Sequence, residues 1–157
     1  MDSCNYSLLI PFLNACEQGS VEDVKKIISY ARAARMDITA MVSELGTDSD
    51  GDSRTPLMAA ARYEHSTIVE MLLQLNADTA ATDDYGFNAL HIAAYNNKTT
   101  TTTVQLLLNN MKLEDINHKN TSGYTPLDLC YYNNSPIKQQ LIDLISQKGG
   151  KRNRLKF

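Results

Sequence analysis

The chain has 157 residues, of which 43% are hydrophobic, which is enough apolar material for one packed domain and argues against wholesale disorder. Its net charge is −3, but residues 148–157 hold five basic side chains and no acidic one, which leaves −8 on the rest. This acidic body argues against nucleic acid as the main partner, because affinity for phosphates comes from Lys and Arg.

The three cysteines are scattered along the chain and form no pattern typical of a metal site. We expect Cys4 to be exposed near the N-terminus, and Cys16 and Cys130 to be buried in place of small residues. Unpaired thiols are typical of a reducing compartment, so we expect a cytoplasmic protein, with the nucleus as the alternative. Neither a signal peptide nor a membrane span is recognised in the sequence.

The first element is a pair of helices without a sequence signature. Apolar side chains recur at helical spacing within residues 9–16 and again within residues 24–28. We expect the second helix to run long, through Tyr30 to Arg35 or further. This pair resembles the capping unit of a repeat array.

An acidic loop over residues 46–52 follows the first pair. Asp48, Asp50 and Asp52 have the spacing that begins a calcium-binding EF-hand loop, which also needs Gly at its sixth position and Glu at its twelfth. Ser53 and Ala59 occupy those positions, so the calcium interpretation is rejected. We expect a solvated loop that offers charge to a basic partner.

One motif then occurs three times, over residues 53–61, 86–94 and 123–131. Thr55 and Asn88 are 33 residues apart in this register, and Asn88 and Thr125 are 37 apart. Proline follows both threonines, and it fits the first turn of a helix, where its missing N–H costs nothing. A second helical stretch follows each motif, and we expect Pro136 to open the last one.

The third unit is extended at two places. The run from Thr99 to Thr103 lengthens the turn between its helices by about two residues, and residues 109–114 lengthen the next loop by about two more. Because β-branched threonines are weak helix formers, we expect a distorted or extended junction there.

A unit of about 33 residues with Thr-Pro-Leu-His-x-Ala-Ala chemistry resembles the ankyrin repeat. The resemblance implies an all-α ankyrin-repeat solenoid of stacked helix-turn-helix units with β-turn tips. It predicts a single domain over residues 1–147 and a basic tail over residues 148–157, with repeats at about 5–47, 50–82, 83–119 and 120–147. The long first joint and the motif after it are also faintly similar to the start of Fem-1-type proteins.

The composition of the basic tail favours a short disordered end. The alternative is a nuclear-localisation signal or an element that binds an anionic surface.

The resemblance also implies that partner-facing side chains lie at the turn tips and just after the inner helices. Five of the eight tyrosines fall in these places, and Tyr and Arg are enriched in binding hot spots. The alternative is that these tyrosines pack between neighbouring turns. The predicted partner-binding residues are Arg54, Arg62, Tyr63, Asp84, Tyr85, Phe87, Tyr95, Asn96, Tyr124 and Tyr132.

No residue pattern typical of catalysis is recognised. In the family pattern His65 and His91 bond the backbone of adjacent turns, and no activated nucleophile stands near either in sequence. Asn117 resembles a residue that is hydroxylated in some ankyrin loops, but fixing the turn is its simpler role. We therefore expect no enzyme, no catalytic or metal-binding residue and no cofactor.

The predicted function is a protein–protein interaction module, a monomer that binds a partner protein through its concave face as an adaptor, regulator or inhibitor. One alternative is a translocated bacterial effector that mimics a host ankyrin scaffold in the host cytosol. Another is a fragment of a longer repeat array with only a structural role.

Overall fold

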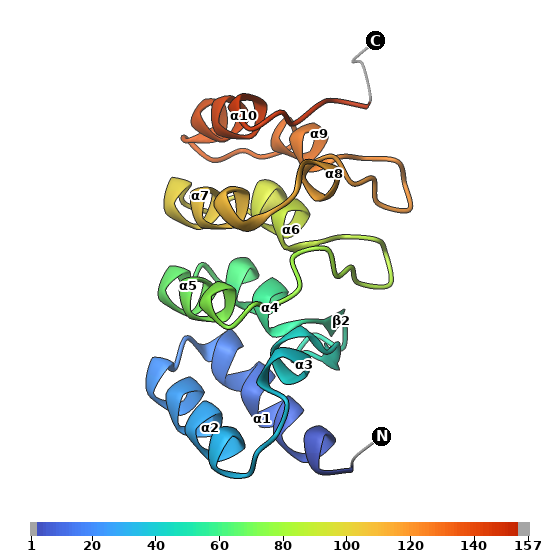
Figure 1. Ribbon diagram of the computed structural model, residues 1–157. Coiled ribbons are helices and arrows are strands. Elements are labelled where there is room, and N and C mark those ends of the chain that lie inside the picture. The colour runs from blue at the N-terminus through green and yellow to red at the C-terminus, as the bar shows by residue number, and fades with distance from the viewer. Residues whose placement is uncertain (1–2, 154–157) are drawn as a thin grey trace.

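The helices stack in pairs along one axis in the computed structural model (Figure 1). It describes residues 3–153, with side chains from residue 8 onward, so the Cys4 thiol and residues 154–157 of the basic tail lie outside the described residues. The pairs are α1 (Ser3–Gln18) with α2 (Val21–Ala33), α4 (Pro56–Arg62) with α5 (Ser66–Gln74), α6 (Ala89–Tyr95) with α7 (Thr101–Asn110), and α9 (Pro126–Cys130) with α10 (Lys138–Gln147).

Three short elements lie in the connections. They are the helices α3 (Ile38–Ser43) and α8 (Leu113–Ile116), and the antiparallel pair of β1 (Gly46–Thr47) with β2 (Ser53–Arg54). The outer helices α2, α5, α7 and α10 form one layer and the inner helices α1, α4, α6 and α9 a second, with turn tips projecting beyond it (Figure 1). The predicted all-α solenoid is confirmed.

The last three inner helices are short and begin with the same cap. The side chains of Thr55, Asn88 and Thr125 each accept a hydrogen bond from the backbone N–H three residues later. Such a cap stabilises a helix by about 1 kcal/mol. The repeated motif is therefore a helix-start signal.

One apolar cluster runs through the whole stack, from Phe12 in α1 to Ile145 in α10. The alanine pairs of the inner helices, such as Ala93 and Ala94, have no exposed surface and allow neighbouring helices to approach closely. Cys16 and Cys130 are free and buried in this cluster, and burial raises the pKa of each thiol to about 12. Both thiols are therefore protonated at neutral pH and weakly nucleophilic.

The turn tips share one hydrogen-bonding pattern. A side-chain oxygen at the first position of the tip accepts the backbone N–H groups of the second and fourth residues after it, and the glycine between them has a positive φ. The three tips are residues 48–52, 83–87 and 120–124, opened by Asp48, Asp83 and Asn120.

The acidic loop is therefore the tip of the second repeat, and the expectation of a wholly solvated loop is wrong. Asp48 is buried, because its carboxylate binds the tip backbone and the guanidinium of Arg54. Asp50, in contrast, is exposed.

Side-chain amides join successive repeats. Asn96 Nδ2 donates to the Arg62 carbonyl at 2.7 Å, and Asn133 Nδ2 donates to the carbonyls of Ala94 at 2.9 Å and Asn96 at 3.0 Å. Asn133 is fully buried. These amides satisfy backbone oxygens that the short inner helices leave without partners.

The histidines make equivalent links. Nε2 of His65 lies 2.8 Å from the Glu17 carbonyl oxygen, and Nε2 of His91 lies 3.0 Å from that of Tyr124. A carbonyl oxygen only accepts, so Nε2 is the protonated nitrogen in each ring. These contacts match the structural role expected for both histidines.

Two helix boundaries differ from the prediction. The second helix ends at Ala33, because Arg35 takes a left-handed conformation with φ 55° and the chain then forms α3, capped by Asp37. The last helix begins at Lys138, two residues after Pro136, which lies in the preceding turn.

The threonine run extends the junction without breaking the helix that follows. Three residues separate α4 from α5 but five separate α6 from α7, which agrees with the predicted extension of about two. The Glu64 carboxylate accepts hydrogen bonds from the backbone N–H and hydroxyl of Thr100, at 2.8 and 3.0 Å, and from the hydroxyl of Thr103. A carboxylate at a helix N-terminus is electrostatically favourable, so the threonines form the first turn of α7.

Residues 151–153 of the basic tail are bound to the third and fourth repeats, which corrects the expectation of a disordered end for them. Lys151 N donates to Asn117 Oδ1 at 2.6 Å, and Asn153 N donates to Asp128 Oδ2 at 3.0 Å. The Arg152 guanidinium lies 3.9 Å from the centre of the Tyr131 ring.

Asp128 occupies the place that His91 has in the preceding motif. An aspartate accepts hydrogen bonds where the histidine donates one, so this position binds an N–H of the tail instead of a carbonyl oxygen.

We expect stability to fall as pH falls from 6.5 to 4. Burial lowers the pKa of His91 from 6.5 to about 4, so the unfolded chain takes up a proton in this range while the folded chain does not. The full loss is roughly 3 kcal/mol. Urea unfolding at pH 7.5 and 4.5 measures it. His91→Gln should flatten this slope, whereas His118→Gln, at an exposed site, should retain most of it; equal slopes in the two variants would contradict the assignment.

We expect Asp128→Asn to lower the free energy of unfolding by about 1 to 3 kcal/mol, because this buried carboxylate, which accepts hydrogen bonds from Thr125 and from the N–H of Asn153, loses its charge. Asp143→Asn removes an exposed carboxylate from α10 and is the matched control. Urea titration compares the two variants. If both lose the same stability, Asp128 has no special role in holding residues 151–153.

Candidate functional site

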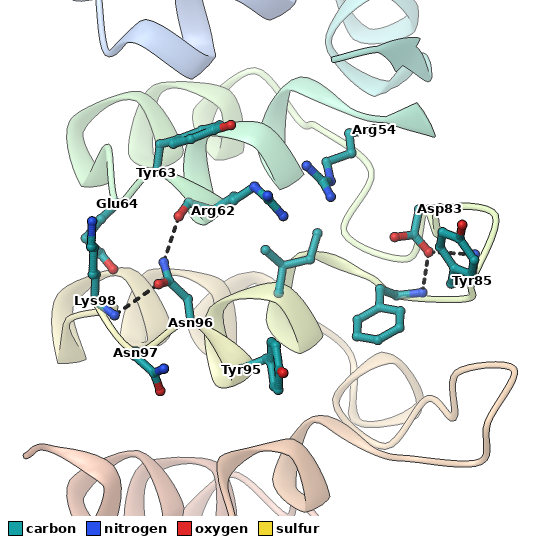
Figure 2. A pocket seen from close by; sticks show the side chains of 12 residues that line it. Arg54, Arg62, Tyr63, Glu64, Asp83, Tyr85, Tyr95, Asn96, Asn97 and Lys98 are labelled. Atoms are coloured by element: carbon teal, nitrogen blue, oxygen red, sulfur yellow. Dashed lines mark hydrogen bonds between the residues drawn. The ribbon is translucent and has the colours of Figure 1, made fainter. Parts of the chain in front are cut away.

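A hollow of about 650 Å³ lies between the second and third repeats. Figure 2 shows Arg62 and Tyr95 on opposite sides of it, with Asp83 and Tyr85 at the end near the turn tip and Lys98 at the other end. The inner helices α4 and α6 form its back wall, and the tip of the third repeat forms its rim. It is therefore built from the places where family resemblance put partner-facing residues.

A second hollow of about 350 Å³ lies between the third and fourth repeats. Among the residues that the structure describes, no charged side chain lines it. Tyr85, Phe87 and Tyr95 line both hollows, so the two adjoin. We call the combined surface the aromatic groove; its other aromatic residues are Tyr63, Tyr124 and Tyr132.

The rings of the groove differ in burial. Tyr85, Tyr95 and Tyr132 are 61%, 58% and 55% exposed, and they come from two successive repeats. Phe87 and Tyr124 are half-buried and pack against the core. The exposed rings contribute little to packing, whereas the half-buried rings also stiffen the stack.

Close ring contacts support this division. The Phe87 ring lies 5.5 Å from that of His91, and the Tyr124 ring meets the Tyr132 ring edge-on at 5.7 Å. Phe87 and Tyr124 therefore take part in packing, whereas Tyr85 and Tyr95 stay largely exposed.

Arg62 and Tyr63 form a charged cluster at the edge of the groove with the exposed Asp50. Arg62 Nη2 lies 2.7 Å from Asp50 Oδ2, and its guanidinium lies 5.7 Å from the centre of the Tyr63 ring. The Tyr63 hydroxyl donates to the same oxygen at 3.4 Å. The positive charge of Arg62 is therefore already paired with the carboxylate of Asp50.

Arg54 does not fit its predicted place. Its side chain is 7% exposed, and its two terminal nitrogens pair with Asp48 and with Asp52, the latter at 2.6 Å. The second repeat has two residues, Ser53 and Arg54, between its tip and the capping Thr55, whereas the other tips run directly into the cap. Arg54 is therefore a buried wall of the hollow and not a tip residue.

Asp84 and Asn96 are two further predicted residues, and they lie in different surroundings. Asp84 is exposed at the tip of the third repeat, beside Asp83. Burial raises the pKa of the Asp83 carboxyl, against the lowering effect of the N–H groups of Phe87 and Tyr85. Asn96 lines the hollow, and its amide binds the Arg62 carbonyl and the N–H of Lys98.

The hollows are also lined by residues outside the predicted set: Glu64, Asp83, Ile92, Asn97, Lys98, Asn120, Thr121, Ser122 and Leu129. Ile92 could have been found, since it precedes Tyr95 by three residues and so shares its helix face. Glu64 and Lys98 lie in the junctions between the two helices of a repeat, where no helical periodicity indicates which way a side chain points.

The groove carries no arrangement that points to catalysis or metal binding. Among the described residues no group of three or more His, Cys, Asp or Glu side chains could hold a metal ion. No helix in that part of the chain is both long and apolar enough to cross a membrane.

Asn117, the candidate for hydroxylation, has both ends of its amide bound. Nδ2 donates to the carbonyls of Leu113 and Gly149, and Oδ1 accepts from Lys151 N. These bonds match the turn-fixing role.

Comparison with known proteins identifies the repeat. The family model described as ankyrin repeats, three copies, matches residues 5–110 and 75–151. A similar curated protein is palmitoyltransferase AKR1 of Lachancea kluyveri, which is 34% identical over 74 residues. The aligned stretch covers 47% of this chain and only 9% of that protein.

We expect Tyr95→Ala to change the free energy of unfolding by about 0.5 kcal/mol or less, because the ring is mostly exposed. Phe87→Ala should cost about 1 to 3 kcal/mol and still fold, because this ring packs half-buried against the core. Urea unfolding followed by helical circular dichroism measures both. A cost for Tyr95→Ala as large as that for Phe87→Ala would mean that Tyr95 belongs to the packing.

Proposed function

The chain belongs to the ankyrin-repeat family, a family of protein-interaction modules, and we propose that it binds a partner protein through the aromatic groove. The groove acts in this proposal as the recognition surface of an adaptor, regulator or inhibitor. The chain functions as a monomer, and its partner is a protein, not nucleic acid.

The observation that carries this proposal is the gathering of exposed tyrosines. Tyr85, Tyr95 and Tyr132 present more than half of their surface on one groove. A tyrosine offers large rigid area and a polar tip at low entropic cost. Burial of one such side chain is worth about 1.5 to 3 kcal/mol before the costs of association.

The proposed function is non-catalytic. The relative from Lachancea kluyveri is named a palmitoyltransferase, but this chain aligns with less than a tenth of it. Within the described chain His91 is fully buried and the thiols of Cys16 and Cys130 are held protonated. These groups are poorly suited to act as a base or a nucleophile.

We also propose a cytoplasmic location. Its support is that Cys16 and Cys130 are unpaired in the core, where a reducing compartment suits them.

Affinity capture from lysate with three versions of the chain tests the proposed surface. The first is wild type, the second is Tyr85→Ala/Tyr95→Ala, and the third is Tyr30→Ala, which removes an equally exposed tyrosine from α2. We expect one protein to be captured by wild type and Tyr30→Ala and reduced at least about ten-fold with the double variant, because two anchor rings are lost. Equal capture by all three would refute the groove as the binding surface.

A further inference from the structure

The aromatic groove has a chemistry that selects among protein partners. We propose that it binds an extended, basic segment of the partner, with arginine or lysine side chains placed against the tyrosine rings. This inference rests on the proposed function and goes beyond it by naming the partner's chemistry.

The charges around the groove are unbalanced towards acid. In the described chain, three basic side chains line the groove: Arg54, Arg62 and Lys98. Five carboxylates line it or pair with these residues: Asp48, Asp50, Asp52, Glu64 and Asp83. This end of the surface therefore attracts a positively charged partner and disfavours an acidic one.

Ion pairs neutralise the two arginines together with three of these carboxylates and leave the acidic excess unchanged. Arg54 is held by two carboxylates and Arg62 by a third, so neither offers an uncompensated charge to a partner. Asp83 lines the first hollow at the tip beside Tyr85, and the adjacent Asp84 is exposed but lines neither hollow. An incoming cation thus meets a carboxylate at the rim and aromatic rings beyond it.

Tyrosine faces complement such a cation. The face of an aromatic ring is electrostatically negative and attracts ammonium and guanidinium groups, most strongly where water is excluded. The chain already uses this contact twice, since Arg152 lies over Tyr131 at 3.9 Å and Arg62 lies near Tyr63 at 5.7 Å. Tyr85 and Tyr95 present the same kind of ring, largely exposed, in the groove.

The shape of the groove favours an extended segment. The two hollows adjoin across successive repeats, so an occupant crosses from the charged first hollow into the second, where the described lining is uncharged. Side chains of an extended strand alternate in direction, so basic residues can face the tyrosines while apolar residues enter the second hollow.

The test uses the whole chain and three synthetic fluorescent peptides. The first alternates arginine with leucine; the other two carry glutamine or glutamate in place of every arginine. Fluorescence anisotropy at low and high salt measures their affinities. We expect the arginine peptide to bind at least about ten-fold more tightly than the glutamine peptide at low salt, with a preference that shrinks as salt rises.

Two substitutions of Tyr95 distinguish the contribution of its aromatic face from that of its side-chain size. Tyr95→Leu should weaken the arginine peptide about five-fold, whereas Tyr95→Phe, which keeps the aromatic face, should stay within about two-fold of wild type. Tyr30→Leu is the control outside the groove and should leave the affinity unchanged. Asp84→Asn should weaken the arginine peptide and not the glutamine peptide.

Three results would overturn the inference: no measurable binding of the arginine peptide, equal binding of the glutamine or glutamate peptide, or equal effects of Tyr95→Leu and Tyr95→Phe. Sedimentation of the free chain checks the other occupant, a second copy; a dimer that Tyr95→Leu dissociates would also overturn it. If the lysate experiment succeeds while the peptides show no basic preference, only the partner's chemistry is wrong. If that capture is indifferent to Tyr85 and Tyr95, the proposed function fails as well.

Discussion

The whole stack depends on satisfying the backbone of very short inner helices. A helix as short as α6 or α9 leaves most of its N–H and C=O groups without partners in the helix. Thr55, Asn88 and Thr125 satisfy the starts, and amides such as those of Asn96 and Asn133 satisfy oxygens near the ends. Each repeat thus supplies polar groups that its neighbour lacks, which joins separate helix pairs into one solenoid and aligns the tips into a groove.

Much of this fold could be predicted because the helix-start motif is local. Thr55-Pro56 or Asn88 signals a cap wherever it occurs, and apolar spacing then identifies the outer helices. The tip of the second repeat could not be placed in this way. Ser53 and Arg54 shift it by two residues relative to Thr55, so the sequence alone indicates only an acidic loop over residues 46–52 and a contact residue at Arg54. The equivalent spacing of Asp48 with Gly51, Asp83 with Gly86 and Asn120 with Gly123 was the signal that distinguishes a tip.

Alignment with the ankyrin repeat could predict that the tyrosines gather on one surface. It could not predict which of them are exposed and which are half-buried. Whether a ring such as Tyr124 packs or projects depends on the neighbouring repeat, and the hydrogen bond from Asn96 to the Arg62 carbonyl depends on the preceding one. The same holds for Asp128, whose partner, the backbone of Asn153, lies 25 residues away. Contacts between repeats depend on how neighbouring units stack, and no local pattern reports that.

The hydrogen bonds inside each tip use a side chain only at the opening residue. The other groups, as at Tyr85 and Phe87, are backbone N–H groups that any residue except proline supplies. The side chains at those two positions can therefore be exchanged through evolution without rebuilding the turn. The turn itself requires only the Asp83 side chain and the positive φ of Gly86, which leaves the side chain of Tyr85 as a variable part of the surface.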